Sequence, residues 1–281
     1  MPRHLQLTDP TRRSWAVDEP RPVRITVWEP EQALHAPVPL ALLSHGTGGS
    51  VETLDWLGEA LSAAGWLVVG VDHHGNTSAE PYLPQGFGFI WERPKDLRYA
   101  LNWAMAERAV DASRIAAVGY SLGGYSVAAL AGARLNTPVV RGVLSGQIPV
   151  PPLPEYPTLV EDLAVAYSPQ ELATQLDAAD ADLRDPRVNR VVLLAPAVGQ
   201  LVAADTLAHV RVPALVMWGA NDDIAAPAEN AHVYRNGIPD ATGVELGAYD
   251  HGIFRSDVAE PSNGRDIRAA VAQRIVGFLR G

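Results

Sequence analysis

Cysteine is absent from the 281-residue chain. Its absence excludes disulfides, thiolate chemistry and cysteine-based zinc or iron–sulfur sites, and it leaves the redox compartment undecided. Lysine occurs only once, as Lys95, so arginine supplies nearly all of the fixed positive charge, which indicates a compositional bias and not a basic binding patch. The net charge of −10 argues against nucleic acid or an anionic membrane surface as a partner.

Long apolar runs are also missing. No stretch approaches the roughly 20 apolar residues that a membrane-spanning helix requires, and residues 1–31 lack the apolar run that follows the basic residues of a secretory signal peptide. We therefore expect a cytoplasmic protein without a membrane span. The sequence does not indicate an oligomeric state.

Short apolar runs alternate with helical patterns along the chain. Residues 1–23 are polar with turn signals at Asp9-Pro10 and Glu19-Pro20, and residues 24–28 alternate in the manner of an edge strand. Buried strands are predicted at 37–44, 66–72, 115–118, 190–194, 214–218 and 244–246. Helices are predicted at 52–64, 91–109, 125–135, 228–235 and 266–279. This alternation predicts an α/β fold with a mostly parallel central sheet and helices on both faces.

Residues 136–185 interrupt the alternation. This segment is rich in proline from 148 to 157 and largely helical in pattern from 159 to 183. We interpret it as an excursion from the main sheet, in a position to cover the active site. Because neither a repeat nor a low-complexity linker is visible, residues 1–281 are expected to form a single domain.

The most informative stretch is residues 115–124, Ile-Ala-Ala-Val-Gly-Tyr-Ser-Leu-Gly-Gly. A buried strand leads directly into the pattern Gly119-x-Ser121-x-Gly123, and an alanine-rich helical segment follows. Strand, Gly-x-Ser-x-Gly and helix in succession are typical of a nucleophile elbow, in which a tight turn exposes the serine hydroxyl. The alternative is a serine that merely caps the helix, but a cap does not require glycine on both sides.

A serine hydroxyl needs a base to take its proton and an acid to orient that base. In this architecture the order along the chain is Ser, then Asp or Glu, then His, all in loops at the carboxyl ends of strands. Asp222 and Asp223 both follow the predicted strand at 214–218 and are candidates for the acid. His232 lies in a predicted helix and is better explained as a surface residue. His251 lies in a loop after the last strand and is the predicted base.

An oxyanion hole needs two backbone N–H groups directed at the carbonyl oxygen. Leu122, directly after the nucleophile, is expected to supply one. The loop His45-Gly46-Thr47-Gly48-Gly49 follows an earlier buried strand, and Thr47 is the expected second donor. The same loop resembles a dinucleotide-binding fingerprint, but the third glycine of that pattern is replaced by Val51 and a second nucleotide-binding half is missing.

Asp72, His73 and His74 follow the next buried strand and suggest a metal site as another alternative. Adjacent histidines on a loop usually point in different directions, and no third ligand is evident. We therefore expect no metal and no cofactor, and we expect this loop to support the floor of the active site.

Six segments together resemble the α/β-hydrolase superfamily, and within it the esterases similar to platelet-activating-factor acetylhydrolase, the bacterial dienelactone-hydrolase-like proteins and the polyester-cleaving cutinases. The segments are Ser44-His45-Gly46-Thr47-Gly48-Gly49, Asp72-His73-His74-Gly75-Asn76, Arg93-Pro94-Lys95-Asp96, residues 119–124, Asp223-Ile224-Ala225-Ala226-Pro227 and Asp250-His251-Gly252. The resemblance covers nearly the whole chain and implies an α/β-hydrolase fold. True dienelactone hydrolases use a cysteine nucleophile, which this chain lacks.

The resemblance also implies roles for individual residues: Ser121 as nucleophile, His251 as base, and Thr47 and Leu122 as oxyanion donors. A cutinase-like loop places the acid four residues after Gly219, which selects Asp223, and this is the residue that we predict. Other members of the superfamily place the acid three residues after the glycine, which would select Asp222.

The predicted function is hydrolysis of small carboxylic esters through an acyl-enzyme on Ser121. Apolar residues are expected around this serine: Trp91, Tyr120, Leu122, Trp218, Ile253 and Phe254. Arginine and lysine are absent from the elbow, the Thr47 loop and residues 249–254, which predicts neutral acyl groups of short to medium length. Alternatives are an amidase or thioesterase with the same triad, or a non-catalytic binding protein of the same fold.

Overall fold

The structure is a computed structural model and describes residues 1–30, 37–150, 152–259 and 267–281. Over these residues it contains one eight-stranded sheet with the order β1-β2-β4-β3-β5-β6-β7-β8. The strands are β1 (Arg3–Arg13), β2 (Pro20–Trp28), β3 (Val38–Ser44), β4 (Leu67–Asp72), β5 (Val110–Tyr120), β6 (Arg190–Leu194), β7 (Ala214–Trp218) and β8 (Ala241–Glu245). β2 pairs antiparallel with both β1 and β4, and all other pairings from β4 to β8 are parallel. The prediction of a mostly parallel sheet is confirmed.

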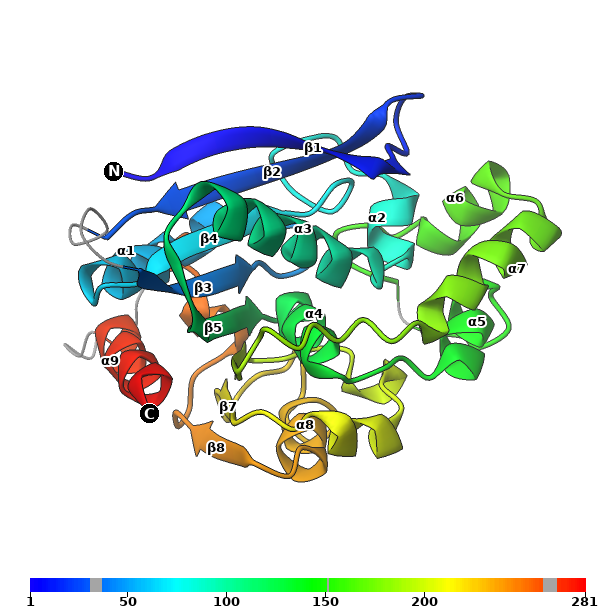
Figure 1. Cartoon of the computed structure of the whole chain (residues 1–281). Helices are drawn as coiled ribbons and strands as arrows, with labels where there is room; N and C mark the ends of the chain where they lie inside the picture. The colour runs from blue at the N-terminus through cyan, green and yellow to red at the C-terminus, as the bar shows by residue number, and fades with distance from the viewer. Residues whose placement is uncertain (31–36, 151, 260–266) are drawn as a thin grey trace.

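Helices cover both faces of the sheet (Figure 1). They are α1 (Asp55–Ala63), α2 (Pro84–Gly88), α3 (Glu92–Glu107), α4 (Leu122–Ala131), α5 (Thr137–Leu144), α6 (Leu159–Ala166), α7 (Pro169–Asp177), α8 (Ala231–Gly237) and α9 (Ile267–Arg280). The buried side chains of α1 and α9 belong to one apolar cluster, and those of α3, α4 and α8 belong to the other. The start of the last predicted helix, residue 266, lies outside the described residues.

The central strand β3 explains why its sequence is apolar without alternation. Leu40 and Leu42 pack into the cluster on one face, whereas Ala41 and Leu43 pack into the cluster on the other. All four side chains are inaccessible to solvent. A strand buried on both faces must be apolar at successive positions.

The structure differs from the sequence prediction at the N-terminus, where the polar segment 1–23 contains the whole of β1 and the start of β2. Most side chains of β1 are exposed, and its only aliphatic side chains, Leu5 and Leu7, are partly buried against the core, which is too short an apolar pattern to identify an eleven-residue strand. β1 is instead held by its antiparallel register with β2, in which Leu5 lies opposite Ile25 and Leu7 opposite Val23. As the edge strand of the sheet, it needs little burial of its own.

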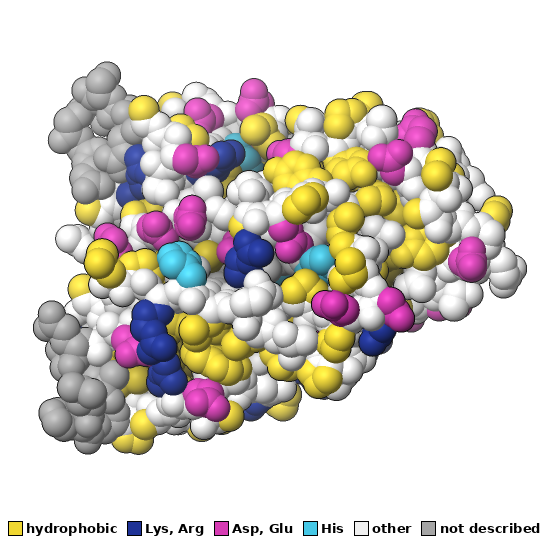
Figure 2. Space-filling model, turned by 90° about the horizontal axis from the view of Figure 1, so that it is seen from above, with side chains coloured by type: hydrophobic (Ala, Val, Ile, Leu, Met, Phe, Trp, Pro, Cys, Tyr) yellow, Lys and Arg dark blue, Asp and Glu magenta, His cyan; other side chains and the backbone are white. Residues whose placement is uncertain are grey.

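The three helices of the segment 136–185 lie together at the end of the molecule toward which β3 and β5 point (Figure 1). α5, α6 and α7 contact one another, and α6 also contacts α2. This contact is close, because a Cβ at Gly88 of α2 would lie 2.8 Å from Leu163 Cδ1 of α6. Hydrophobic side chains gather on the surface toward this end of the molecule (Figure 2). None of the helices in the described ranges is both long and apolar enough to traverse a bilayer.

Candidate active site

Ser121 occupies the single position between the end of β5 and the start of α4. Its backbone has φ +53° and ψ −119°, a conformation that costs energy for a residue with a side chain. The flanking glycines are required by close backbone approach. A Cβ at Gly119 would lie 2.0 Å from the carbonyl oxygen of Gly123, and a Cβ at Gly123 would lie 2.1 Å from the carbonyl oxygen of Ser44. The turn therefore has the geometry of a nucleophile elbow.

The Ser121 hydroxyl faces an imidazole and a carboxylate in line. Its Oγ lies 2.9 Å from His251 Nε2, and His251 Nδ1 lies 2.7 Å from Asp222 Oδ2. All three side chains are buried, with relative exposures of 4–6%. Although Ser121 stands at the N-cap position of α4, its side chain makes no capping hydrogen bond. The hydroxyl is thus directed at the histidine and not at the helix.

The acidic partner of His251 is Asp222, and the prediction of Asp223 is wrong. The side chain of Asp223 is exposed. Asp222 Oδ1 accepts hydrogen bonds from the backbone amides of Ile224 (3.1 Å) and Ala225 (2.7 Å), which leaves Oδ2 turned toward the imidazole. The chain therefore follows the three-residue spacing after Gly219 and not the cutinase-like spacing.

Backbone contacts fix the loop that carries the acid to the loop that carries the base. Ala220 N–H donates to the carbonyl of Gly247 (2.7 Å), and Asn221 N–H donates to the carbonyl of Tyr249 (3.0 Å). A Cβ at Gly219 would lie 2.0 Å from the carbonyl oxygen of Tyr249, so only glycine fits there. Direct backbone contacts therefore join the two loops.

Tyr120, directly before Ser121, contacts His251 through both its hydroxyl and its ring. Its hydroxyl donates to the backbone carbonyl of His251 (3.1 Å), and its ring lies 5.1 Å from the His251 ring between centroids. Burial raises the pKa of the Tyr120 phenol, which keeps it protonated as a donor. Asp250 accepts a hydrogen bond from Gly252 N–H (2.9 Å) and shapes the turn in which His251 stands.

The expected oxyanion loop lies against the nucleophile. A Cβ at Gly46 would lie 3.1 Å from Ser121 Cβ and 3.0 Å from the Tyr120 ring. Over the described part of the chain, neither the Thr47 nor the Leu122 amide donates to a backbone carbonyl outside regular elements. Neither amide is thus engaged by such a carbonyl, a condition that an oxyanion donor must meet.

Asp72, His73 and His74 turn to three different sets of partners, which is incompatible with a shared metal ion. Asp72 accepts from Val51 N–H (2.9 Å), and burial raises its pKa. The His73 side chain contacts Ser44 Oγ (2.9 Å) and Asp96 Oδ2 (3.1 Å). The His74 side chain contacts Glu80 Oε1 (2.6 Å) and Ser14 Oγ (3.1 Å), and its Nε2 accepts from Trp15 N–H (3.3 Å).

The loop that carries Asp72, His73 and His74 also contacts the oxyanion loop. His73 N–H donates to His45 Nε2 (3.1 Å), and His45 Nδ1 donates to the carbonyl of Gly46 (2.6 Å). Burial, together with the nearby Arg93 charge, lowers the pKa of His73 to about 3 and that of His45 well below its usual value. Both imidazoles are therefore neutral, and each holds one tautomer that suits its partners.

Sequence reasoning assigned no role to Arg93 and Asn76, two buried residues under the site. Arg93 donates to Asn76 Oδ1 (3.1 Å), which also accepts from Gly48 N–H (2.9 Å). Arg93 additionally donates to the carbonyl oxygen of His45 through a short hydrogen bond. Both residues lie in segments that carry the family resemblance, but the helical pattern around Arg93 does not show in which direction its side chain points.

The sequence profile of the α/β hydrolase fold family matches residues 39–187, which is more than half of the chain. The chain belongs to the α/β hydrolase fold family. The matched region of this α/β hydrolase extends from β3 past α7 and contains Ser121, whereas Asp222 and His251 lie beyond it. No sequence among the curated proteins matches significantly. Membership of this family supports a hydrolase but does not identify its substrate.

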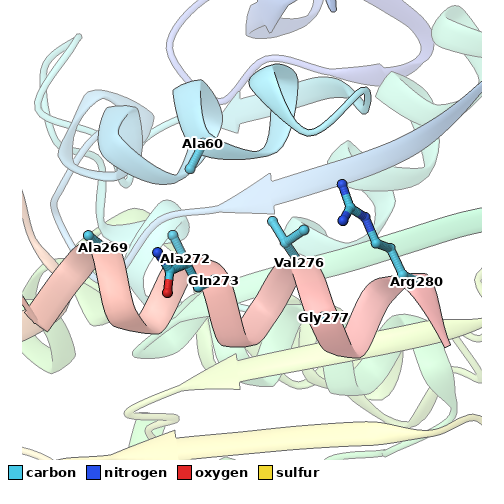
Figure 3. Close-up of a pocket in the computed structure, with 7 residues that line it drawn as sticks. All are labelled: Ala60, Ala269, Ala272, Gln273, Val276, Gly277 and Arg280. Atoms are coloured by element: carbon cyan, nitrogen blue, oxygen red, sulfur yellow. The ribbon is translucent and has the colours of Figure 1, made fainter.

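The α/β hydrolase also has a surface groove of about 420 Å³ away from the triad (Figure 3). It runs between α1 and α9 and is lined mainly by small or apolar residues, among them Ala60, Ala272 and Val276. Gln273 and Arg280 are its polar members. Because none of the triad residues reaches it, this groove is separate from the candidate active site.

Proposed function

We propose that the protein is a serine hydrolase that cleaves small carboxylic esters through an acyl-enzyme on Ser121. The observation that carries the proposal is the chain of contacts from Ser121 Oγ through His251 to Asp222. Beside it, among the described residues, the Thr47 and Leu122 amides donate to no backbone carbonyl outside regular elements. Hydrogen bonding to a base activates the hydroxyl, and the free amides can bind the oxygen that gains charge.

The reaction would proceed in two halves. Ser121 Oγ attacks the ester carbonyl while His251 Nε2 takes the hydroxyl proton, and the tetrahedral oxyanion accepts hydrogen bonds from Thr47 and Leu122 N–H. The C–O bond to the alcohol breaks, and the leaving oxygen receives the proton from His251. Water then attacks the acyl carbon, His251 takes and returns its proton, and the acid leaves. Asp222 stays ionised and stabilises the imidazolium.

A neutral acyl group is favoured because the nearby arginines are already engaged. Arg93 is buried and donates to neutral acceptors below the oxyanion loop. Arg255 donates through Nε (2.9 Å) and Nη2 to the carboxylate of Asp257. An acyl carboxylate entering the site would therefore lose hydration without gaining a free cation.

Not all six expected apolar residues lie against the triad. The Tyr120 ring lies tilted against His251, with 5.1 Å between centroids, and the Phe254 ring lies 6.2 Å from the Tyr120 ring. Trp91 instead stacks on Phe89 in the core, and Trp218 Nε1 donates to Glu245. The acyl-binding wall that we propose is correspondingly smaller than the sequence suggested.

We further propose that the segment 136–185 covers the site. A Cβ at Gly48 of the oxyanion loop would lie 3.0 Å from Glu155 Cγ, which belongs to this segment. The ring of Tyr156 lies 5.0 Å from that of Phe87, and Tyr82 donates from its hydroxyl to the Gly48 carbonyl (2.5 Å). These contacts support a cover of aromatic residues over the Thr47 side of the pocket.

The proposal is tested by covalent labelling with a fluorophosphonate, which reacts with an activated serine whatever the natural substrate. The chain offers a matched control in Ser14, which contacts His74, which in turn contacts Glu80, but which lacks an elbow. We expect Ser14→Ala to be labelled like the wild type and Ser121→Ala to remain unlabelled. No labelling of the wild type, or loss of labelling in Ser14→Ala alone, would overturn the proposal.

Substrate class is then measured with p-nitrophenyl esters of increasing acyl length. Amide and thioester analogues of the same acyl group complete the panel, because one triad can serve all three leaving groups. We expect kcat/KM to be highest for the esters and to rise with acyl length until the pocket is filled, by up to about 0.8 kcal/mol per methylene.

A further inference from the structure

We propose that Arg93 is the positioning residue that holds both halves of the oxyanion hole in one geometry. The inference rests on the proposed function, because it assigns the hole to the amides of Thr47 and Leu122. Arg93 belongs to α3, contacts neither Ser121 nor His251 through any hydrogen bond, and is 1% exposed. It acts through the segments that carry the two donors.

The first contact is with the Thr47 loop. Arg93 Nη2 donates to the carbonyl of His45, two residues before Thr47. Arg93 Nη1 donates to Asn76 Oδ1 (3.1 Å), and the same oxygen accepts from Gly48 N–H (2.9 Å), one residue after Thr47. The guanidinium thereby fixes the backbone on both sides of Thr47, which sets the direction of the Thr47 N–H.

The second contact is with the first turn of α4. Arg93 Nε donates to Ser126 Oγ (3.1 Å), and the Ser126 hydroxyl donates to the carbonyl of Leu122 (3.2 Å). Leu122 begins α4 directly after the nucleophile. A single rigid fork of N–H donors thus connects the loop donor to the helix donor, a task for which a guanidinium is suited and an ammonium is not.

Arg93 and Arg21 are both buried arginines, but their hydrogen-bond acceptors differ in charge. Arg21 is equally buried but binds Asp96 through two hydrogen bonds of 2.8 and 3.1 Å. All hydrogen-bond acceptors of Arg93 are neutral, and burial lowers its pKa to about 9, so it remains a cation at neutral pH. A buried cation without a directly bound carboxylate is costly for stability, and it would favour negative charge developing above it.

The test uses p-nitrophenyl butyrate and n-butylboronic acid, whose tetrahedral anionic adduct with serine presents an oxygen to the oxyanion hole. In Arg93→Gln we expect kcat to fall by about 10²-fold, as for loss of one oxyanion donor, with KM changed by less than about threefold. The boronate Ki should rise in parallel with the loss in kcat/KM. Arg93→Lys, which keeps the charge without the fork, should recover only part of the loss.

Ser126→Ala keeps the experiment decisive if Arg93→Gln does not fold, because it deletes one hydroxyl from the path to Leu122. It should lower kcat by about tenfold and weaken the boronate by a similar factor. Rates are expressed per serine labelled by fluorophosphonate. If the variants lower only Tm and keep kcat and boronate affinity, Arg93 is structural and the inference fails while the proposed function stands. If wild-type Ser121 is not labelled, the proposed function itself fails.

Discussion

Asp222 and His251 are separated by 29 residues in the chain, yet Asp222 Oδ2 lies 2.7 Å from His251 Nδ1. Their loops follow the neighbouring parallel strands β7 and β8 and are linked by the hydrogen bond from Ala220 N–H to the Gly247 carbonyl. Since the pairing of the two strands fixes the pairing of the loops, the carboxylate and the imidazole meet only in the folded sheet.

The two adjacent aspartates allow a matched test of this contact. Asp222→Asn should lower kcat on p-nitrophenyl butyrate by roughly 10⁴-fold, because an amide cannot hold the imidazole in the required tautomer. Asp223→Asn changes an exposed side chain and should leave kcat within about threefold. The larger loss in Asp223→Asn would contradict the assignment of Asp222 as the acid.

Two substitutions of Ser121 distinguish loss of the hydroxyl, which affects kcat, from relief of backbone strain, which affects stability. Both Ser121→Ala and Ser121→Gly should lose kcat by several orders of magnitude. Because φ is +53°, only glycine relieves the strain, so the glycine variant should be more stable than the alanine variant by about 1 kcal/mol. Urea unfolding of the two variants measures the difference, and equal stability would argue against a strained elbow.

Replacing glycine by alanine should change stability in opposite directions at Gly123 and at Gly277. Gly123→Ala would place a methyl group 2.1 Å from the Ser44 carbonyl oxygen, so the elbow should be disrupted, with a loss of several degrees in Tm and of activity. Gly277 lies in α9 with no atom within 4 Å of its added Cβ, and Gly277→Ala should stabilise by about 0.5–1 kcal/mol. Differential scanning fluorimetry compares them, and a stable, active Gly123→Ala protein would contradict the close approach of Gly123 to β3.

His73 predicts a pH dependence of stability. Its pKa is about 3 in the folded protein, against about 6.5 in the unfolded chain, because it is buried beside Arg93. Between these two pH values only the unfolded state binds the proton. The contribution of His73 to the free energy of unfolding is therefore fully present above pH 6.5 and decreases as the pH falls toward 3. This residue alone contributes a slope of about 1.4 kcal/mol per pH unit.

Urea unfolding between pH 7 and 4.5 measures that slope. We expect His73→Asn to reduce this slope by about 1.4 kcal/mol per pH unit, the contribution of one proton, whatever its effect on stability at pH 7. His4→Gln, at an exposed position, is the control and should keep the wild-type slope. An unchanged slope in His73→Asn would show that His73 is protonated in the folded state.

The proposed site should discriminate against negatively charged acyl groups. Butyrate and hemisuccinate esters of the same alcohol should differ in kcat/KM in favour of butyrate, because Arg93 and Arg255 are engaged by other groups. Asp257→Asn frees Arg255 and should narrow the difference. A preference of the wild type for the hemisuccinate would require a cation that reaches the acyl group.

The contact between Ser121 and His251, the proposed nucleophile and base, could be anticipated from the sequence because both residues carry local or ordered signals. The Ser121 pattern depends on a strand, a turn and a helix that are contiguous in the chain, and His251 stands out as the loop histidine after the last strand. The alternative acids could not be separated in this way. Asp222 is selected by its own hydrogen bonds to the amides of residues 224 and 225, which only the folded turn reveals.

Other features depend on packing between distant segments. In the sequence, Arg93 belongs to a segment that carries the resemblance, but its helical pattern does not reveal that it is buried, which follows only when α3 packs against α4 and β3. β1 was not predicted for the opposite reason, since most of its side chains are exposed, its apolar pattern is limited to Leu5 and Leu7, and its pairing with β2 defines the rest. Periodicity identifies elements that bury a face, so it fails for buried charges and for exposed edge strands.

The order of the strands has a consequence for biosynthesis. Ser121 and both oxyanion segments lie in the first half of the chain, whereas the acid and the base follow β7 and β8 near its end. During translation the proposed nucleophile Ser121 therefore leaves the ribosome well before His251, the proposed base, which lies 130 residues further along the chain. If the proposed function holds, a nascent or truncated chain ending before β8 would carry an unactivated Ser121, and hydrolytic activity would require the strand β8 to have formed.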